Sequence, residues 1–222
     1  YLRCPLPRCR SLRCPPWLCC HHLHAVAATF AGRRGLSWSG VMASTLPFCG
    51  KGIGGFDLSG AQDKVFAYDH DGKGRMDHLV LYRPGAGRIS ILKRQGNGFV
   101  AVYQRDSGGI GGYDLATPTD LGFAFDYDGK GSNDHLVFYR PGKGAIFILK
   151  PSDGDFKAVY RQADNGGGIG QYDLHHPADR MFAFDYRGNG VADHLVLYRP
   201  GTGVLQIVRN NSGAFVRIYA KP

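Results

Sequence analysis

Phe123 to Leu149 reads FAFDYDGKGSNDHLVFYRPGKGAIFIL, and this stretch decides the fold. Near-copies of it lie at Phe66 to Leu92 (FAYDHDGKGRMDHLVLYRPGAGRISIL) and at Phe182 to Val208 (FAFDYRGNGVADHLVLYRPGTGVLQIV). A repeated unit that cannot bury its apolar face alone must stack on its neighbours. The sequence therefore predicts three equivalent structural units in series.

A glycine-rich marker precedes each copy, at Gly52–Leu58 (GIGGFDL), Gly109–Leu115 (GIGGYDL) and Gly168–Leu174 (GIGQYDL). The markers recur after 57 and 59 residues, a period longer than the ~40–50 residues of common propeller blades. Each unit therefore has room for an additional loop. We predict a repeat domain over residues 51–222, with units at about 52–108, 109–167 and 168–222.

Four strands are predicted in the middle unit, at Phe123–Asp126, His135–Arg140, Ala145–Lys150 and Phe156–Tyr160. The second is almost continuously apolar, as expected of a strand that is covered on both faces. Pro-Gly and Asp-Gly turns separate the last three strands. Four short antiparallel strands in a repeated unit are typical of a propeller blade.

The fold class predicted is all-β: three four-stranded antiparallel blades of a partial β-propeller, either open or closed by oligomerisation. The 33 glycines and the many β-branched and aromatic residues agree with this class. Closed propellers usually need ~4–8 blades, and three units fall short of that number. A β-trefoil, which is also built from three four-stranded units, is the alternative.

The formal charge of +9 is concentrated in the first fifty residues, which hold six arginines and no acidic residue. The rest of the chain carries 21 basic and 18 acidic residues, and every acidic residue is Asp. A nucleic-acid-binding protein needs a basic stripe on its folded part, so this balance argues against nucleic acid as a partner. No apolar run is long enough to span a membrane.

Residues 1–50 are predicted to be an Arg/Cys/Pro-rich leader that is disordered or signal-like. All six cysteines lie there, and four of them are spaced by five residues. That spacing differs from the two-to-four-residue gaps of common zinc modules, so a metal or disulfide knot is the weaker alternative. We expect a secreted protein. The cysteines are Cys4, Cys9, Cys14, Cys19, Cys20 and Cys49.

The repeated unit resembles the VCBS/FG-GAP-like repeat family, which forms integrin-like and lectin-type propeller blades. The matching residues are the Phe-Ala-Phe-Asp-Tyr-Asp-Gly-Lys-Gly lead, the Asp at the ninth loop position, and the Leu-Val-Phe-Tyr-Arg-Pro-Gly strand and turn. The resemblance covers about Gly52 to Tyr219. It implies a propeller fold, and it is compatible with adhesion, lectin and accessory roles.

In that family the Asp/Gly loop commonly binds calcium through its first, third, fifth and ninth positions. Here Lys73, Lys130 and Arg187 each occupy one of those positions, where an oxygen ligand is expected. We therefore favour loops without metal, in which the cation pairs with the carboxylates and backbone bonds close the loop. Calcium is the alternative, and its ligands would be the carboxylates of the first two loops, Asp69, Asp71, Asp77, Asp126, Asp128 and Asp134.

An Asp-His pair recurs at Asp77-His78, Asp134-His135 and Asp193-His194. Such a pair can orient a general base, but a catalytic site is normally built only once. Adjacent strand residues also point to opposite faces, so the two side chains are not expected to bond. We interpret the histidine as structural and predict that the protein is not an enzyme. The recurring arginines Arg83, Arg140 and Arg199 are expected to pair with loop aspartates.

The function predicted is a non-catalytic binding module, with a carbohydrate as the favoured ligand. The alternative is a structural or protein-interaction repeat domain of a larger secreted protein. A lectin site would place aromatic rings against sugar faces and loop carboxylates against hydroxyl groups. The partner would be a glycan or a protein, and a homo-oligomer is an open alternative. The ligand-binding candidates are Phe56, Asp57, Tyr113, Asp114, Tyr172 and Asp173.

Overall fold

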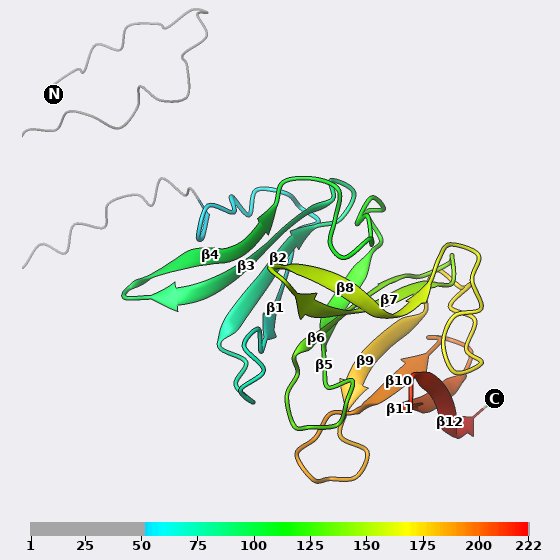
Figure 1. The fold of residues 1–222 in the computed structure, drawn as a ribbon. Helices are drawn as coiled ribbons and strands as arrows, with labels where there is room; N and C mark the ends of the chain where they lie inside the picture. Colours follow the sequence, from blue (N-terminus) through cyan, green and yellow to red (C-terminus); the bar gives the residue numbers. More distant parts are fainter. Residues whose placement is uncertain (1–51, 222) are drawn as a thin grey trace, which may run out of the picture. The chain divides into compact units, whose positions relative to one another are not determined.

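A computed structural model describes residues 52–221, and all regular secondary structure in that range is β-strand. The strands form three four-stranded antiparallel sheets (Figure 1), which confirms the all-β prediction. The predictions for residues 1–50 lie outside the described residues. The first sheet holds β1 (Lys64–Tyr68), β2 (His78–Arg83), β3 (Arg88–Gln95) and β4 (Gly98–Arg105), the second holds β5 (Leu121–Phe125), β6 (His135–Arg140), β7 (Ala145–Ser152) and β8 (Asp155–Gln162), and the third holds β9 (Arg180–Phe184), β10 (His194–Tyr198), β11 (Leu205–Asn211) and β12 (Ala214–Lys221).

Each sheet is a meander in which consecutive strands pair with one another. In the middle sheet β6 has the bounds that its apolar run predicts, whereas β7 and β8 are longer than predicted. The reason is the tight turn at Asp153 and Gly154, whose φ angles of 51° and 79° extend the pairing to Ser152 and Asp155. Two consecutive residues with positive φ match the natural twist of a hairpin.

The apolar cores lie between the sheets, because the second strand of each sheet carries apolar side chains on both of its faces. Leu136 and Phe138 of β6 belong to the core shared with the first sheet. Val137 and Tyr139 belong to the core shared with the third sheet. Every residue of β6 is buried, so the prediction that this strand is covered on both faces is confirmed.

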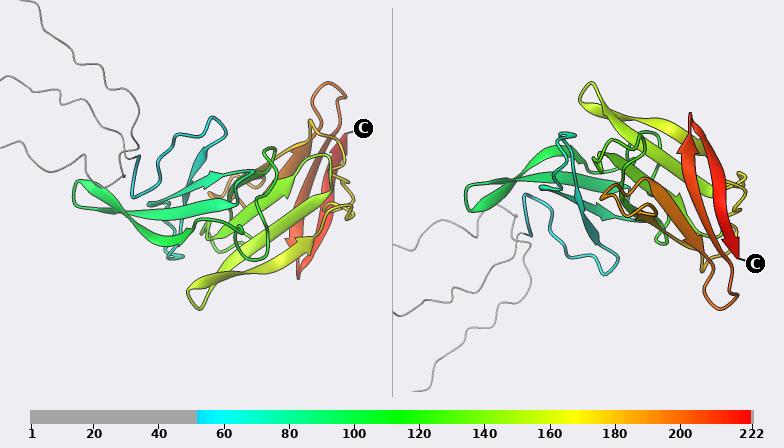
Figure 2. Two further views of the ribbon diagram at one scale, coloured as in Figure 1. Left: turned by 90° about the horizontal axis from the view of Figure 1, so that it is seen from above. Right: turned by 90° about the horizontal axis from the view of Figure 1, so that it is seen from below.

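The sheets follow one another like propeller blades, as both views of Figure 2 show. The first strands of successive units, β1, β5 and β9, contact their neighbours in that order. All strand pairing lies within single units of the described chain. A trefoil would pair strands across its units to close a barrel, so the structure is a partial β-propeller of three blades rather than the alternative.

The glycine-rich marker forms a tight loop between one blade and the next. In the second unit the backbone N–H groups of Ile110 and Tyr113 each donate to the other residue's carbonyl, at 2.8 Å. Gly109 donates its N–H to the Gly87 carbonyl of the preceding blade at 2.8 Å. A Cβ added to Gly109, whose φ is +71°, would lie 1.8 Å from the Tyr113 carbonyl oxygen. The marker is therefore a joint between blades that requires glycine.

Gly109→Ala should destabilise the fold far more than Gly108→Ala. Both glycines have positive φ (71° and 81°), but a Cβ on Gly108 would meet nothing within 4 Å. We expect Gly108→Ala to lower the free energy of unfolding by about 1–2 kcal/mol, the cost of left-handed backbone in an alanine. Gly109→Ala should add about 1–3 kcal/mol or more for the overlap. Urea unfolding measures the free energy of unfolding of both variants. Equal losses of this free energy would contradict the conclusion that the joint between blades requires glycine at position 109.

Candidate functional site

The first Asp of each Asp/Gly loop is held by backbone N–H groups. The Asp69 carboxylate is buried and accepts hydrogen bonds from the N–H groups of Lys73, Gly74 and Arg75 at 3.1, 2.6 and 3.2 Å. Bonds of this kind close a loop from within, because a carboxylate satisfies several otherwise unpaired donors. The same bonds recur from Lys130 and Gly131 to Asp126, and from Asn189 and Gly190 to Asp185.

The cation in each loop is paired with a loop carboxylate. Lys73 Nζ lies 2.9 Å from Asp71, and Lys93 Nζ of β3 lies 3.2 Å from the same carboxylate. The hydrogen bonds from Lys73 and then Lys93 lower the pKa of Asp71 to about 2. In the other loops the ion pairs are Lys130 with Asp128 and Arg187 with Asp193.

The Asp-His pairs are in contact, contrary to the expectation that adjacent side chains diverge. His135 Nδ1 is hydrogen bonded to Asp134 at 2.6 Å. In the first unit the corresponding atoms of His78 and Asp77 approach to 2.7 Å without hydrogen-bond geometry. The strand alternation does not apply, because the Asp precedes the strand and only the His belongs to it. The histidines at the starts of β2, β6 and β10 are buried.

Within the described residues, one group of three acidic or histidine side chains has its ligand atoms close together: Asp128, Asp134 and His135. Two of the three are hydrogen bonded to each other, and Asp128 is paired with Lys130. Calcium prefers oxygen ligands, and the group includes a nitrogen. Calcium binding by the six loop carboxylates stays the alternative to a loop without metal.

The predicted ligand-binding aromatics are buried, while the acids beside them are half-exposed. Phe56, Tyr113 and Tyr172 are core residues of the blades. Their rings face neighbouring side chains, as in the stack of Tyr113 on Phe138, whose ring centroids are 5.8 Å apart. The structure thus separates each aromatic from the Asp that follows it, and the ligand-binding role of these six residues stays a prediction.

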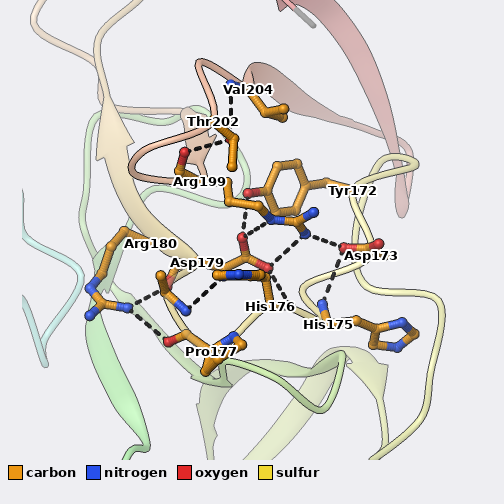
Figure 3. A network of polar contacts seen from close by, with 11 residues as sticks. Tyr172, Asp173, His175, His176, Pro177, Asp179, Arg180, Arg199, Thr202 and Val204 are labelled. Carbon is orange, nitrogen blue, oxygen red and sulfur yellow. Dashed lines mark hydrogen bonds and ion pairs between the residues drawn. The ribbon is translucent and has the colours of Figure 1, made fainter.

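The recurring arginine is the centre of a polar network that is repeated in every blade. Figure 3 shows the third copy, in which Arg199 Nε donates to Asp179 at 2.8 Å and Arg199 Nη2 donates to Asp173 at 2.7 Å. The Tyr172 hydroxyl donates to the buried Asp179 at 2.7 Å. The second copy consists of Arg140, Asp120, Asp114 and Tyr113, and the first of Arg83, Asp63 and Asp57, with Phe56 in place of the tyrosine.

The buried member of this network, Asp63, Asp120 or Asp179, is not among the site residues predicted from the sequence. The signal was available, because these residues recur at the repeat period and follow the marker Asp by six positions. The hydrogen bonds to Asp120 raise the pKa of Arg140, despite the opposing effect of burial. Burial opposes the shift at Asp114, but bonds from the Ala116 N–H and from Arg140 hold its pKa below the usual value.

A pocket of about 260 Å³ opens beside the network of the middle blade. Arg140 binds Asp164 there through Nη1, at 3.1 and 3.2 Å from the two carboxylate oxygens. Arg161 of β8 lies over the Phe147 ring, with its guanidinium carbon 5.1 Å from the ring centroid. No hydrogen bond or ion pair joins the Arg161 guanidinium to another residue in the described range 52–221. The lining residues are Gly112, Tyr113, Asp114, Arg140, Ala145, Phe147, Arg161, Ala163 and Asp164.

The side chains that create this pocket are those that differ between the units. Where the middle blade has Ala145, the first blade has Arg88. The guanidinium carbon of Arg88 lies 4.6 Å from the Phe56 ring centroid, and its Nη2 donates to the Gly55 carbonyl. The third blade has Val204 at the same position. Small Ala145 leaves open the space that Arg88 fills. Phe147 corresponds to Ser90 and Gln206, and Arg161 to Gln104 and Ala220.

No family model matches the chain, and no curated protein matches it. Membership of the VCBS/FG-GAP family therefore stays a hypothesis.

Within the described residues, no helix is long and apolar enough to cross a membrane.

Several solved structures resemble the chain. One, from Bacteroides fragilis, is described provisionally as a 6-phosphogluconolactonase; it is 11% identical, with a TM-score of 0.43 over 70% of this chain and 37% of its own. A second, from Bacteroides uniformis, carries the same description, at 12% identity and a TM-score of 0.40 over 70% and 38%. The third is the periplasmic gluconolactonase of Pseudomonas aeruginosa, at 12% and 0.38 over 71% and 38%.

These similarities concern the propeller-type fold, and the chain spans less than two fifths of each of the three structures. The structures are named as lactonases, and none of the three as a lectin or an adhesion module. Against this comparison, the prediction of a non-catalytic, lectin-like or structural module is wrong, and so is the prediction that the protein is not an enzyme.

Removing the buried acid of the network should destabilise the protein far more than removing the exposed one. Asp120→Ala leaves the Arg140 guanidinium and the Tyr113 hydroxyl without their buried partner, and we expect a loss of about 3–5 kcal/mol. Asp114→Ala removes a carboxylate that is half-exposed, and we expect a loss below ~1 kcal/mol. Chemical unfolding of the two variants measures the difference. A larger loss for Asp114→Ala would contradict the assignment.

Proposed function

We propose that the middle-blade pocket is the active site of a hydrolase acting on a small, hydroxylated anion with an ester or lactone bond. What carries the proposal is that the pocket combines Arg161, Asp164 and Ala145, and that different residues stand at the positions of Arg161 and Ala145 in both other blades and at the position of Asp164 in the first. A constellation that occurs once in a repeated scaffold is what a catalytic site requires.

Arg161 is the group that would bind the substrate's negative charge. Its guanidinium presents N–H donors in a planar fork that suits a carboxylate or a phosphate. Stacking on Phe147 holds the fork in place. Arg140 is less suited to this task, because Asp114, Asp120 and Asp164 already surround it.

Asp164 is the proposed general base. Its carboxylate is half-exposed, borders the pocket and is held by Arg140. It would take a proton from water as the water oxygen attacks the carbonyl carbon, and would return the proton to the oxygen that leaves when the ester bond breaks. The product is a hydroxy acid.

The size of the pocket favours a substrate of sugar-acid size. Its volume of about 260 Å³ lies below the ~300–1,000 Å³ of pockets for drug-sized ligands. The half-exposed carboxylates of Asp114 and Asp164 can accept hydrogen bonds from hydroxyl groups. A phosphorylated sugar lactone, the substrate named in the descriptions of two similar structures, has the charge, the hydroxyls and the cleavable bond.

The test is the opening of 6-phosphogluconolactone by the full chain, followed by acid release and corrected for spontaneous hydrolysis. Wild-type protein should accelerate ring opening. Asp164→Asn should lower kcat by about 10²-fold or more, the usual contribution of a general base. Arg161→Gln, which introduces the residue of the first blade, should raise KM about tenfold through loss of one charge-assisted contact.

Arg217→Gln is the matched control, because Arg217 is an exposed arginine of β12 outside the pocket; it should retain wild-type rates. A wild-type rate no faster than spontaneous hydrolysis would overturn the assignment to this lactone. Equal losses for Arg161→Gln and Arg217→Gln would overturn the role of Arg161.

We also propose that the repeat has a VCBS/FG-GAP-like origin, without the lectin function that this resemblance suggested. We further propose that the protein is located outside the cytoplasm.

A further inference from the structure

The outer face of the third blade is apolar and exposed. Phe184 is 40% exposed, although the residues at its position in the first and second blades, Tyr68 and Phe125, are fully buried. Phe182 is 45% exposed and packs against Tyr198 of the same face. In the first two blades this face is covered by the next blade.

The outer face of the first blade is the complementary case. Leu58, in the marker loop, is 43% exposed, whereas Leu115 and Leu174 at the same position are fully buried against the preceding blade. Val65 of β1 is 50% exposed, and Met181 at its position in the third blade is buried. This face has the residues that bind a preceding blade in the other units, but no blade precedes the first one within residues 52–221.

The residues that form hydrogen bonds between blades have equivalents on the two outer faces, where no neighbouring blade lies within residues 52–221. The Tyr139 hydroxyl accepts the Met181 N–H at 3.0 Å, and the Gly142 N–H donates to the Leu174 carbonyl at 2.9 Å. The residues equivalent to Tyr139 and Gly142 on the third blade are Tyr198 and Gly201. The residues equivalent to Met181 and Leu174 on the first blade are Val65 and Leu58.

We propose that two copies of the chain bind head to tail and close into a six-bladed ring. The third blade of each copy covers the first blade of the other, with Tyr198 accepting the Val65 N–H and Gly201 donating to the Leu58 carbonyl. Six blades lie within the ~4–8 found in closed propellers. A head-to-tail interface that closes forms a ring and leaves no apolar face uncovered.

A second copy is the occupant that the residues favour, because the two faces already match in sequence and hydrogen bonding. The neighbouring blades within the chain use the same interface twice. The middle-blade pocket uses residues of neither outer face, so this proposal and the proposed function fail independently.

The test is the mass of the full 222-residue chain in solution, measured by light scattering over a range of concentrations. Wild-type protein should have twice the monomer mass. Phe182→Glu on the third blade and Leu58→Glu on the first blade should each give monomers, because each places a charge in an apolar interface. Val100→Glu, at an exposed apolar residue of β4 outside both faces, should stay dimeric.

An equimolar mixture of the Phe182→Glu and Leu58→Glu variants should recover dimers, because each variant contributes one intact face. Hydrogen exchange provides a second readout that does not depend on the variants: the Val65 N–H should become more protected as wild-type concentration rises. A wild-type monomer at all concentrations, an open-ended oligomer, or a mixture that stays monomeric would each overturn the ring.

Discussion

Covering of apolar sheet faces is the constraint on which this structure depends. A four-stranded sheet whose central strand is apolar on both sides cannot be stable alone, because burial of each face requires a second layer. β6 meets this requirement through both neighbours and is buried along its whole length. The arrangement of the blades, the position of the marker loops and the exposed faces at either end of the series follow from it.

The joints between blades are polar, and they determine how the apolar faces meet. Glycines of the marker allow backbone contacts that a Cβ would block, as at Gly109. The Arg–Asp network ties the end of the second strand to the marker loop, with one carboxylate buried and one half-exposed. Because its buried acid has several donors around it, the network fixes geometry in every blade, and it leaves little freedom for a function of its own.

The function that we propose, in contrast, rests on residues that are not repeated. The comparison of units draws attention to shared positions, and those positions serve the scaffold. Ala145 in place of Arg88 leaves room for the pocket in the middle blade, and Arg161 lines that pocket from a position that is Gln104 or Ala220 in the other blades. A prediction based on recurring Asp, His and aromatic residues therefore described the scaffold and overlooked the differences, which is the physical reason that a non-catalytic module was expected.

The sequence by itself determined the number of units, their strands, the tight turns and the strand that is buried on both faces, because period-2 alternation and Gly-rich turns are local signals. Only the tertiary structure decided which acid each arginine binds, that the marker aromatics are buried, and that the Asp-His neighbours touch. The arginine pairs depend on contacts between residues 20 or more positions apart, such as Arg140 with Asp120 and Asp164, whereas the Asp-His contact depends on where the strand begins. The pocket also depends on tertiary packing, because its walls come from a marker loop, three strands and the loop after β8, which only packing brings together.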